Sequence, residues 1–135
     1  MPFTEAEKLL LNNLGILSHT LQMFVGEDLL NSLYYHAKLF VFPSIYEGFG
    51  MPLLEAMANH CPMAISRASC FPEIAEDAAA YFNPIDENDI QNTVKRLLEN
   101  EQERKSLIEK GNERVKKFTW ETASQKLADV YKKVL

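Results

Sequence analysis

The chain has 135 residues, 47% of them hydrophobic, which suits one domain with a single core. No apolar run approaches the roughly 20 residues of a membrane-spanning helix, and the first residues lack the basic and apolar regions of a signal peptide, so we expect a cytoplasmic domain. Residues 1–85 carry nine acidic and three basic side chains and the net charge is −5, which disfavours nucleic-acid binding.

The first elements are predicted from a capping box and from apolar runs. Thr4 and Glu7 have the spacing of a capping box, which predicts a helix over about residues 5–13. Residues 21–25 have the composition of a strand. Asp28 is then expected to cap a helix that leads toward the next strand.

The central stretch, residues 38–59, reads KLFVFPSIYEGFGMPLLEAMAN. Its apolar run at 39–42 is typical of a strand that is buried on both faces of a parallel sheet. Gly48 and Gly50 allow a tight turn, and Pro52 is typical of the first position of a helix. The stretch therefore predicts a strand, a glycine loop and a helix start in succession.

This succession is typical of a site for a phosphorylated ligand. In an open parallel sheet, ligands bind at the carboxyl ends of the strands, and a helix N-terminus offers free N–H groups and a partial positive charge to a phosphate. We expect a diphosphate near residues 48–51, between Glu47 and Glu55. One carboxylate can hold two adjacent sugar hydroxyls, so a nucleotide sugar fits. Either glutamate alone is equally well explained as a solvated loop residue or a partner of the helix dipole.

Strands and helices continue to alternate after the glycine loop. Strands are predicted at 62–66 and 80–82, with a short helix at 71–75 between them. From Asp86, which caps the next helix, only helices are predicted, the second of them at 104–117. The pattern predicts an α/β fold: a Rossmann-like parallel sheet flanked by helices, followed by a helical C-terminal segment.

The last predicted helix opens at Thr119 and has a one-sided apolar stripe. The stripe consists of Trp120, Ala123, Leu127, Tyr131 and Val134. We expect Leu127 and Val134 to pack on the core of this domain. The alternative is that part of the stripe is exposed as an apolar patch.

Metal and disulfide chemistry are not indicated. Cys61 and Cys70 have no metal-ligand spacing and are too few for a disulfide framework, so free thiols are expected. The three histidines also share no metal-ligand spacing. Asp86 and Asp89 are explained more simply by a helix cap than by a metal site.

The string PSIYEGFGMPLLEAMAN resembles the donor-binding signature of the GT-B glycosyltransferases of group 1 (family 4), in which two glutamates separated by seven residues follow a Pro-Ser step. The likeness continues through CPMAIS and FPEIAEDAAAYFNP and ends with FTW before the last helix, so it covers nearly all of the chain. It implies that residues 1–135 are a single domain, part of the C-terminal nucleotide-sugar-binding lobe of a longer enzyme. The acceptor lobe and the units that carry a basic phosphate-binding pair are expected to lie outside this chain.

The resemblance also implies an activity. A hexosyltransferase of this kind moves a sugar, with retention, from a nucleoside diphosphate to an acceptor hydroxyl in glycan assembly. Glu47 would be the catalytic residue that holds the donor sugar, and Glu55 would hold the ribose diol. The donor-binding residues would be Gly48, Phe49, Gly50, Met51, Leu54 and Glu55. No metal or other cofactor is expected, because the helix N-terminus and basic residues do the work of a divalent ion.

The segment PEIAEDAAAYFNP is similar to members that use mannose donors, which favours GDP-mannose over a UDP-sugar. A glycan or lipid-linked acceptor would bind through the missing lobe, and the resemblance allows peripheral membrane association of the full enzyme. The isolated chain is expected to be inactive. The alternative function is a non-catalytic nucleotide or nucleotide-sugar binding module.

Two features depart from the family pattern. The segment GEDLLNSLY is shorter than the family's segment that helps to seat the base, which leaves the base open. His60 stands where many members have the glycine that ends the signature helix. A non-glycine residue adopts that left-handed conformation only with strain, so the helix end is a place where this chain can differ from the family.

Overall fold

The computed structural model describes residues 2–134, which form two compact units. The first unit ends at Leu30 and the second begins at Asn31. No helix among the described residues has the length and apolar character needed to cross a bilayer.

The first unit contains α1 (Glu5–Asn13) and the short 3-10 helix η1 (Leu17–His19). The predicted capping box is present: the Thr4 N–H donates to the Glu7 carboxylate at 2.7 Å, and the Glu7 N–H donates to the Thr4 hydroxyl at 3.3 Å. The predicted strand at 21–25 is wrong, because these residues are irregular. A strand needs a neighbour for its backbone groups, and no described strand pairs with this segment.

The next helix, α2 (Glu27–His36), begins two residues earlier than a cap at Asp28 predicts. Asp28 therefore lies in the first turn and is not the cap. Its carboxylate still suits this place, because negative charge near a helix N-terminus is stabilising.

A three-stranded parallel sheet, in the order β1-β2-β3, forms the centre of the second unit and confirms the predicted α/β fold. Its strands are β1 (Phe40–Phe42), β2 (Met63–Ser66) and β3 (Ala80–Phe82). Every residue of β2 is buried, but Val41 of β1 is 37% exposed. The prediction that the first strand is buried on both faces is therefore wrong. Among the described strands β1 lies at the edge of the sheet, where only one neighbour covers it.

The helix that follows the glycine loop is α3 (Met51–Ala58). Pro52 was predicted to be its first residue and is its second. It ends with His60 in the left-handed region, at φ +57°. The His60 N–H donates to Met57 O at 3.2 Å and the Cys61 N–H donates to Ala56 O at 2.9 Å, which is the Schellman pattern. His60 thus gives the helix end that glycine usually gives, and its Nδ1 lies 2.6 Å from Asn112 Oδ1.

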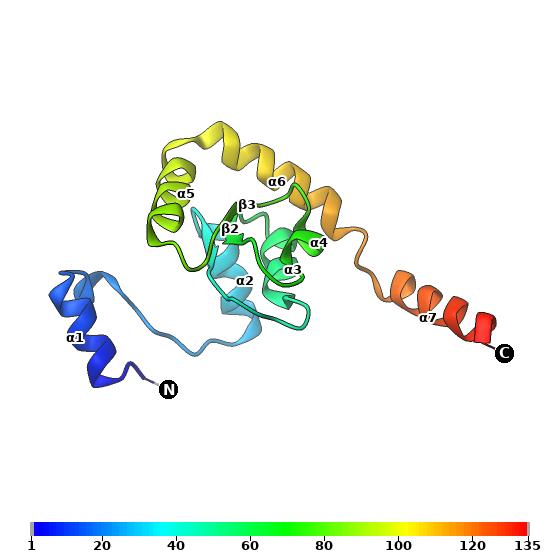
Figure 1. The fold of residues 1–135 in the computed structure, drawn as a ribbon, viewed down its shortest axis with the longest axis horizontal. Coiled ribbons are helices and arrows are strands. Elements are labelled where there is room, and N and C mark those ends of the chain that lie inside the picture. Colours follow the sequence, from blue (N-terminus) through cyan, green and yellow to red (C-terminus); the bar gives the residue numbers. More distant parts are fainter. Residues whose placement is uncertain (1, 135) are drawn as a thin grey trace. The chain divides into compact units, whose positions relative to one another are not determined.

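Three further helices of this unit lie around the sheet and α3 (Figure 1). They are α4 (Phe71–Ala75), α5 (Glu87–Glu99) and α6 (Glu101–Val115), and α6 begins three residues earlier than predicted. Asp86 caps α5 as expected, with its carboxylate accepting from two N–H groups. Helix α5 packs on β2 and β3, and α6 packs on α3. The core cluster consists of Ala64, Ala80, Phe82, Leu97 and Leu107.

The last helix, α7 (Trp120–Val134), carries no buried residue. Leu127 is 57% exposed and Val134 is 80% exposed, so the prediction that they pack on the core is wrong. The alternative, an exposed apolar stripe, describes this helix. In Figure 1, α7 is the last helix of the chain and is joined to α6 by a short irregular segment.

Candidate functional site

The glycine loop, residues 43–50, joins the carboxyl end of β1 to the first turn of α3. Gly50 has φ +90°, and a Cβ at this position would lie 3.2 Å from the Phe71 ring. A Cβ at Gly48 would meet nothing within 4 Å, and Gly48 is not in the left-handed region. The turn therefore requires glycine at position 50, whereas position 48 shows no such requirement.

The head of α3 presents unpaired amides. Among residues 2–134, no acceptor pairs with the N–H groups of Phe49, Gly50 and Met51. Met51 is 56% exposed and Phe49 is 44% exposed, whereas Gly50 between them is buried. Aligned N–H groups with the positive end of a helix dipole form a place where an anion can bind.

Each of the two predicted carboxylates is held by a neighbouring hydroxyl group. The Ser44 hydroxyl donates to Glu47 Oε1 at 3.0 Å, within the glycine loop. The Tyr34 hydroxyl, on α2, donates to Glu55 Oε2 at 3.3 Å. Glu47 Oε2 and Glu55 Oε1 accept no hydrogen bond from the described residues. Each glutamate therefore has one oxygen that accepts a hydrogen bond and one that has no partner among the described residues.

Tyr34 is buried and packs edge-to-face on Phe40, with the ring centroids 5.2 Å apart. Burial first, and then the charge and hydrogen bond of Glu55, together raise the pKa of Tyr34 to about 12. The hydroxyl therefore keeps its proton at neutral pH and remains a donor to Glu55. In the sequence Tyr34 is only one apolar position of a helix, so this role was missed.

A turn after β2 touches the glycine loop from the other side. Ser69, at φ +52°, donates its hydroxyl to Glu47 O at 2.8 Å and accepts the Glu47 N–H at 3.4 Å. Cys70 Sγ lies 3.2 Å from Phe49 O. Cys61 and Cys70 are both free thiols, as predicted. Sequence reasoning missed the contact of Ser69 with Glu47, because 22 residues separate the partners and no local pattern marks it.

Three of the surface cavities of the second unit lie near α3 or α6, and neither predicted glutamate lines any of these three. The apolar one, of about 400 Å³, brings Phe49, Met51 and Leu54 together with Phe118 and the first turn of α7. The rings of Phe49 and Phe118 are 6.1 Å apart. Three of the predicted donor-binding residues therefore line this apolar cavity: Phe49, Met51 and Leu54. Glu47 and Glu55 lie outside it.

A second cavity, of about 380 Å³, lies beside Gly48 and Phe49 and is lined by Arg114, Lys117 and Lys126. Arg114 is already engaged: it donates to Ile74 O at 2.7 Å and to Glu73 O at 2.6 Å, the carbonyl groups near the end of α4. Its charge is therefore used to hold α6 against α4. Lys117 is paired with Glu76 at 3.9 Å, so Lys126 is the one cation on this wall that has no partner among the described residues.

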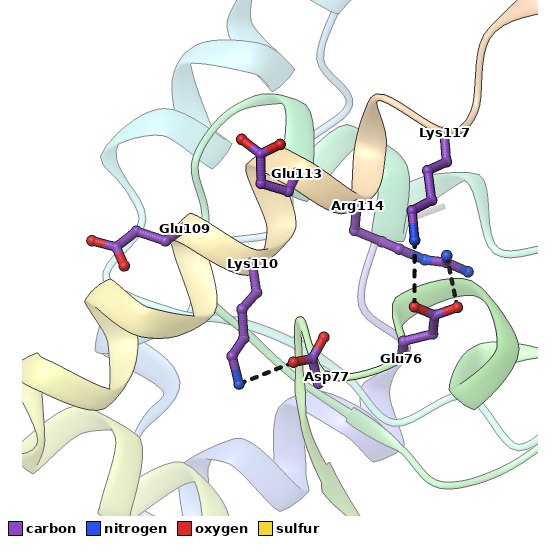
Figure 2. A pocket seen from close by; sticks show the side chains of 7 residues that line it. All are labelled: Glu76, Asp77, Glu109, Lys110, Glu113, Arg114 and Lys117. Carbon is purple, nitrogen blue, oxygen red and sulfur yellow. Dashed lines mark ion pairs between the residues drawn. The ribbon is translucent and has the colours of Figure 1, made fainter.

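The third cavity, of about 320 Å³, is lined by charged side chains of α6 and of the turn after α4 (Figure 2). Glu76 pairs with Arg114 at 2.7 Å and with Lys117 at 3.9 Å, and Asp77 pairs with Lys110 at 3.2 Å. Because these acids and bases neutralise one another, the cavity is best explained as a seam between two elements. No cluster of His, Cys, Asp or Glu suited to a metal ion occurs among residues 2–134.

Comparisons with known proteins agree with one another. The family described as glycosyl transferases group 1 matches residues 3–114. The O-antigen chain mannosyltransferase B of Escherichia coli is 34% identical over 109 residues, which are 81% of this chain and 29% of that protein. The MMP alpha-(1->4)-mannosyltransferase of Mycolicibacterium hassiacum is 33% identical over 132 residues, which are 93% of this chain and 32% of that protein.

A solved structure is similar over almost the same range. Sucrose-phosphate synthase from Thermosynechococcus elongatus has a TM-score of 0.79 and 28% sequence identity, and the likeness covers 94% of this chain and 33% of that one. The chain therefore spans about a third of the length of the proteins that it matches.

Proposed function

The chain belongs to the glycosyl transferases of group 1, and on that premise we propose that it forms part of the donor site for retaining transfer of a sugar from a nucleoside diphosphate to an acceptor hydroxyl. Its fold is that of the C-terminal domain of a GT-B glycosyltransferase. We further propose that residues 1–135 act as one part of the nucleotide-sugar-binding lobe of a longer enzyme.

The observation that carries the proposal is the open head of α3 at the carboxyl end of β1. In glycosyl transfer, negative charge grows on the departing diphosphate while positive charge grows on the sugar. The unpaired N–H groups of Phe49, Gly50 and Met51 are fixed dipoles that stabilise the leaving group without having to reorganise. Gly48 lets the diphosphate approach the backbone, because no protein atom fills the space where a Cβ would point.

The glutamates supply recognition of sugar hydroxyls. Glu47 holds hydroxyls of the donor sugar, and Glu55 holds the ribose diol, each through the oxygen that its neighbouring hydroxyl leaves open. Leu54 lies in the same helix between the amides and Glu55 and completes the donor-side surface. Glu47 is the group nearest to the reacting sugar in this arrangement and has the catalytic role.

We propose a mannose donor, GDP-mannose rather than a UDP-sugar, because both relatives described above are named mannosyltransferases. The acceptor is a glycan or a lipid-linked glycan bound by the rest of the enzyme, on the cytoplasmic side and with peripheral membrane contact. The charge of the leaving group is carried by the helix head and lysines, so donor binding does not depend on a metal ion or another cofactor.

A second candidate applies to these 135 residues alone: donor binding without transfer. The observation that favours it is the engagement of Arg114 and of Lys117, which pairs with Glu76 at 3.9 Å. Of the cations that line the cavity beside the glycine loop, only Lys126 has no partner among the described residues. A diphosphate normally needs basic side chains as well as backbone amides. Weak, salt-sensitive binding with no detectable transfer is the expected behaviour of the isolated chain.

The test is an NMR titration of the ¹⁵N-labelled chain with GDP-mannose, GDP and UDP-glucose, with and without EDTA. Amide shifts are expected at residues 48–54, with GDP-mannose and GDP stronger than UDP-glucose and EDTA without effect. Glu55→Ala should weaken binding by about tenfold or more, because a hydrogen bond to a charged group is lost. Glu99→Ala, at an exposed carboxylate at the end of α5, is the matched control. Shifts confined to α5, α6 and α7, or equal loss in both variants, would refute the proposal.

A further inference from the structure

A turn that lies outside the glycine loop holds this loop in place. We propose that Ser69 is a positioning residue of the donor site: its hydroxyl fixes the peptide groups of Glu47 and thereby the amides at the head of α3. The part of this proposal that concerns ligand binding rests on the proposed function, whereas the part that concerns loop order does not.

The hydrogen bonds of Ser69 are unusual because both join one side-chain oxygen to one backbone residue. The hydroxyl donates to Glu47 O at 2.8 Å, and the same oxygen accepts the Glu47 N–H at 3.4 Å. Both polar backbone groups of Glu47 are thus tied to Ser69, which limits rotation about the Glu47 φ and ψ angles. Cys70 adds a weaker contact to the next part of the loop, with its Sγ 3.2 Å from Phe49 O.

The loop has little else to hold it. None of the side chains from position 43 to position 49 is buried, and a Cβ at Gly48 would touch no atom within 4 Å. Core packing therefore does not fix the path of these residues. Their hydrogen bonds do. Those from Ser69 reach Glu47 from the turn after β2, and Cys70 Sγ adds a weaker contact with Glu47 O at 3.5 Å.

The backbone of Ser69 gives a second, independent observation. Ser69 is at φ +52°, a left-handed conformation that favours glycine over other residues. Glycine would relieve this strain but could make neither bond to Glu47. Replacing Ser69 with glycine therefore removes the hydrogen bonds to Glu47 but relieves the backbone strain. This difference allows a loss of loop order to be separated from a loss of stability.

The experiment compares Ser69→Ala and Ser69→Gly in the full chain. Both lose the hydroxyl, but only Gly relieves the strain, so Gly should be at least as stable as Ala in urea unfolding. Both should nevertheless lose loop order to the same extent, with ¹⁵N order parameters at residues 47–51 falling from about 0.85 toward 0.6. Amides of β2 and β3 should not change. Ser106→Ala, at an exposed serine of α6, is the matched control.

GDP is then titrated into each protein, and both Ser69 variants should bind about tenfold more weakly than the unchanged chain. Unchanged loop order in Ser69→Ala would overturn the proposal. It would also be overturned if Ser69→Gly kept the loop order of the unchanged chain while Ser69→Ala lost it, because loop order would then depend on stability and not on the hydroxyl. A loosened loop with unchanged GDP affinity would overturn the positioning role. If the unchanged chain itself does not respond to GDP or GDP-mannose while both variants loosen the loop, the proposed function fails and the hold of Ser69 on the loop is supported.

Discussion

Helices α5 and α7 have the same kind of amphipathic sequence, but only α5 is part of a core. On α5, Leu97 is 0% exposed and packs with residues of β2 and β3. On α7, no residue is buried. A one-sided apolar stripe tells which face of a helix needs cover, and it does not tell whether a covering surface is present. The difference between the two helices lies in their surroundings, not in their own residues.

The comparison is tested most strongly by removing one leucine from each helix. Leu97→Ala should lower the free energy of unfolding by about 2–5 kcal/mol, because it removes buried methyl groups and leaves a cavity. Leu127→Ala should change it by less than about 0.5 kcal/mol, because this side chain is already exposed to water. Urea unfolding of both variants measures the two values. A loss at Leu127 comparable to that at Leu97 would show that α7 packs on a core after all.

A smaller difference in stability is expected between variants of two glycines of the second unit, Gly50 and Gly111. Gly50→Ala should cost about 1–3 kcal/mol, because alanine is strained at φ +90° and its Cβ would lie 3.2 Å from the Phe71 ring. Gly111→Ala, in the middle of α6, should stabilise the protein by roughly 0.5–1 kcal/mol through helix propensity. Its Cβ would lie 3.4 Å from Met57 Cγ, an ordinary contact. Thermal unfolding decides between them: destabilisation by Gly111→Ala would mean that the α3 and α6 interface is packed too closely for a methyl group.

The smallest effect on stability is expected at Tyr34 of α2, whose hydroxyl donates to Glu55. Its pKa is raised to about 12 in the folded chain, from 10.0. The folded state therefore keeps the proton longer than the unfolded state. This contribution to stability is complete below about pH 10 and is lost as the pH rises toward about 12.

Tyr34→Phe should remove this contribution, so the stability of the variant should fall less steeply between about pH 10 and 12 than that of the unchanged chain. At neutral pH the loss should be about 1 kcal/mol, the usual value of one hydrogen bond. Tyr81, whose pKa burial also raises to about 12, stays in both proteins and serves as an internal reference. The free energy of unfolding of both proteins is measured with urea at several alkaline pH values. If it falls equally steeply with pH in both, the assignment to Tyr34 is contradicted.

Local sequence was enough for much of the fold. The capping box at Thr4, the short helix at 71–75 and the strand at 80–82 were predicted at their observed bounds, since each depends on residues that are close in the chain. The parallel direction of the strands was also predicted, from the alternation of strands and helices, but their order in the sheet was not. The roles of Glu47 and Glu55 in donor binding stay predictions.

The sequence alone determined the α/β fold class, the helix start after the glycine loop and the family, because dihedral preferences, caps and motif spacing are local properties. Only the tertiary structure decided that residues 21–25 form no strand, that the stripe of α7 is exposed, and that Tyr34 and Ser69 hold Glu55 and Glu47. These facts depend on partners that are about 20 residues away or absent from the described chain. Hydrogen bonds and burial need such a partner, and no local pattern reports whether it is there.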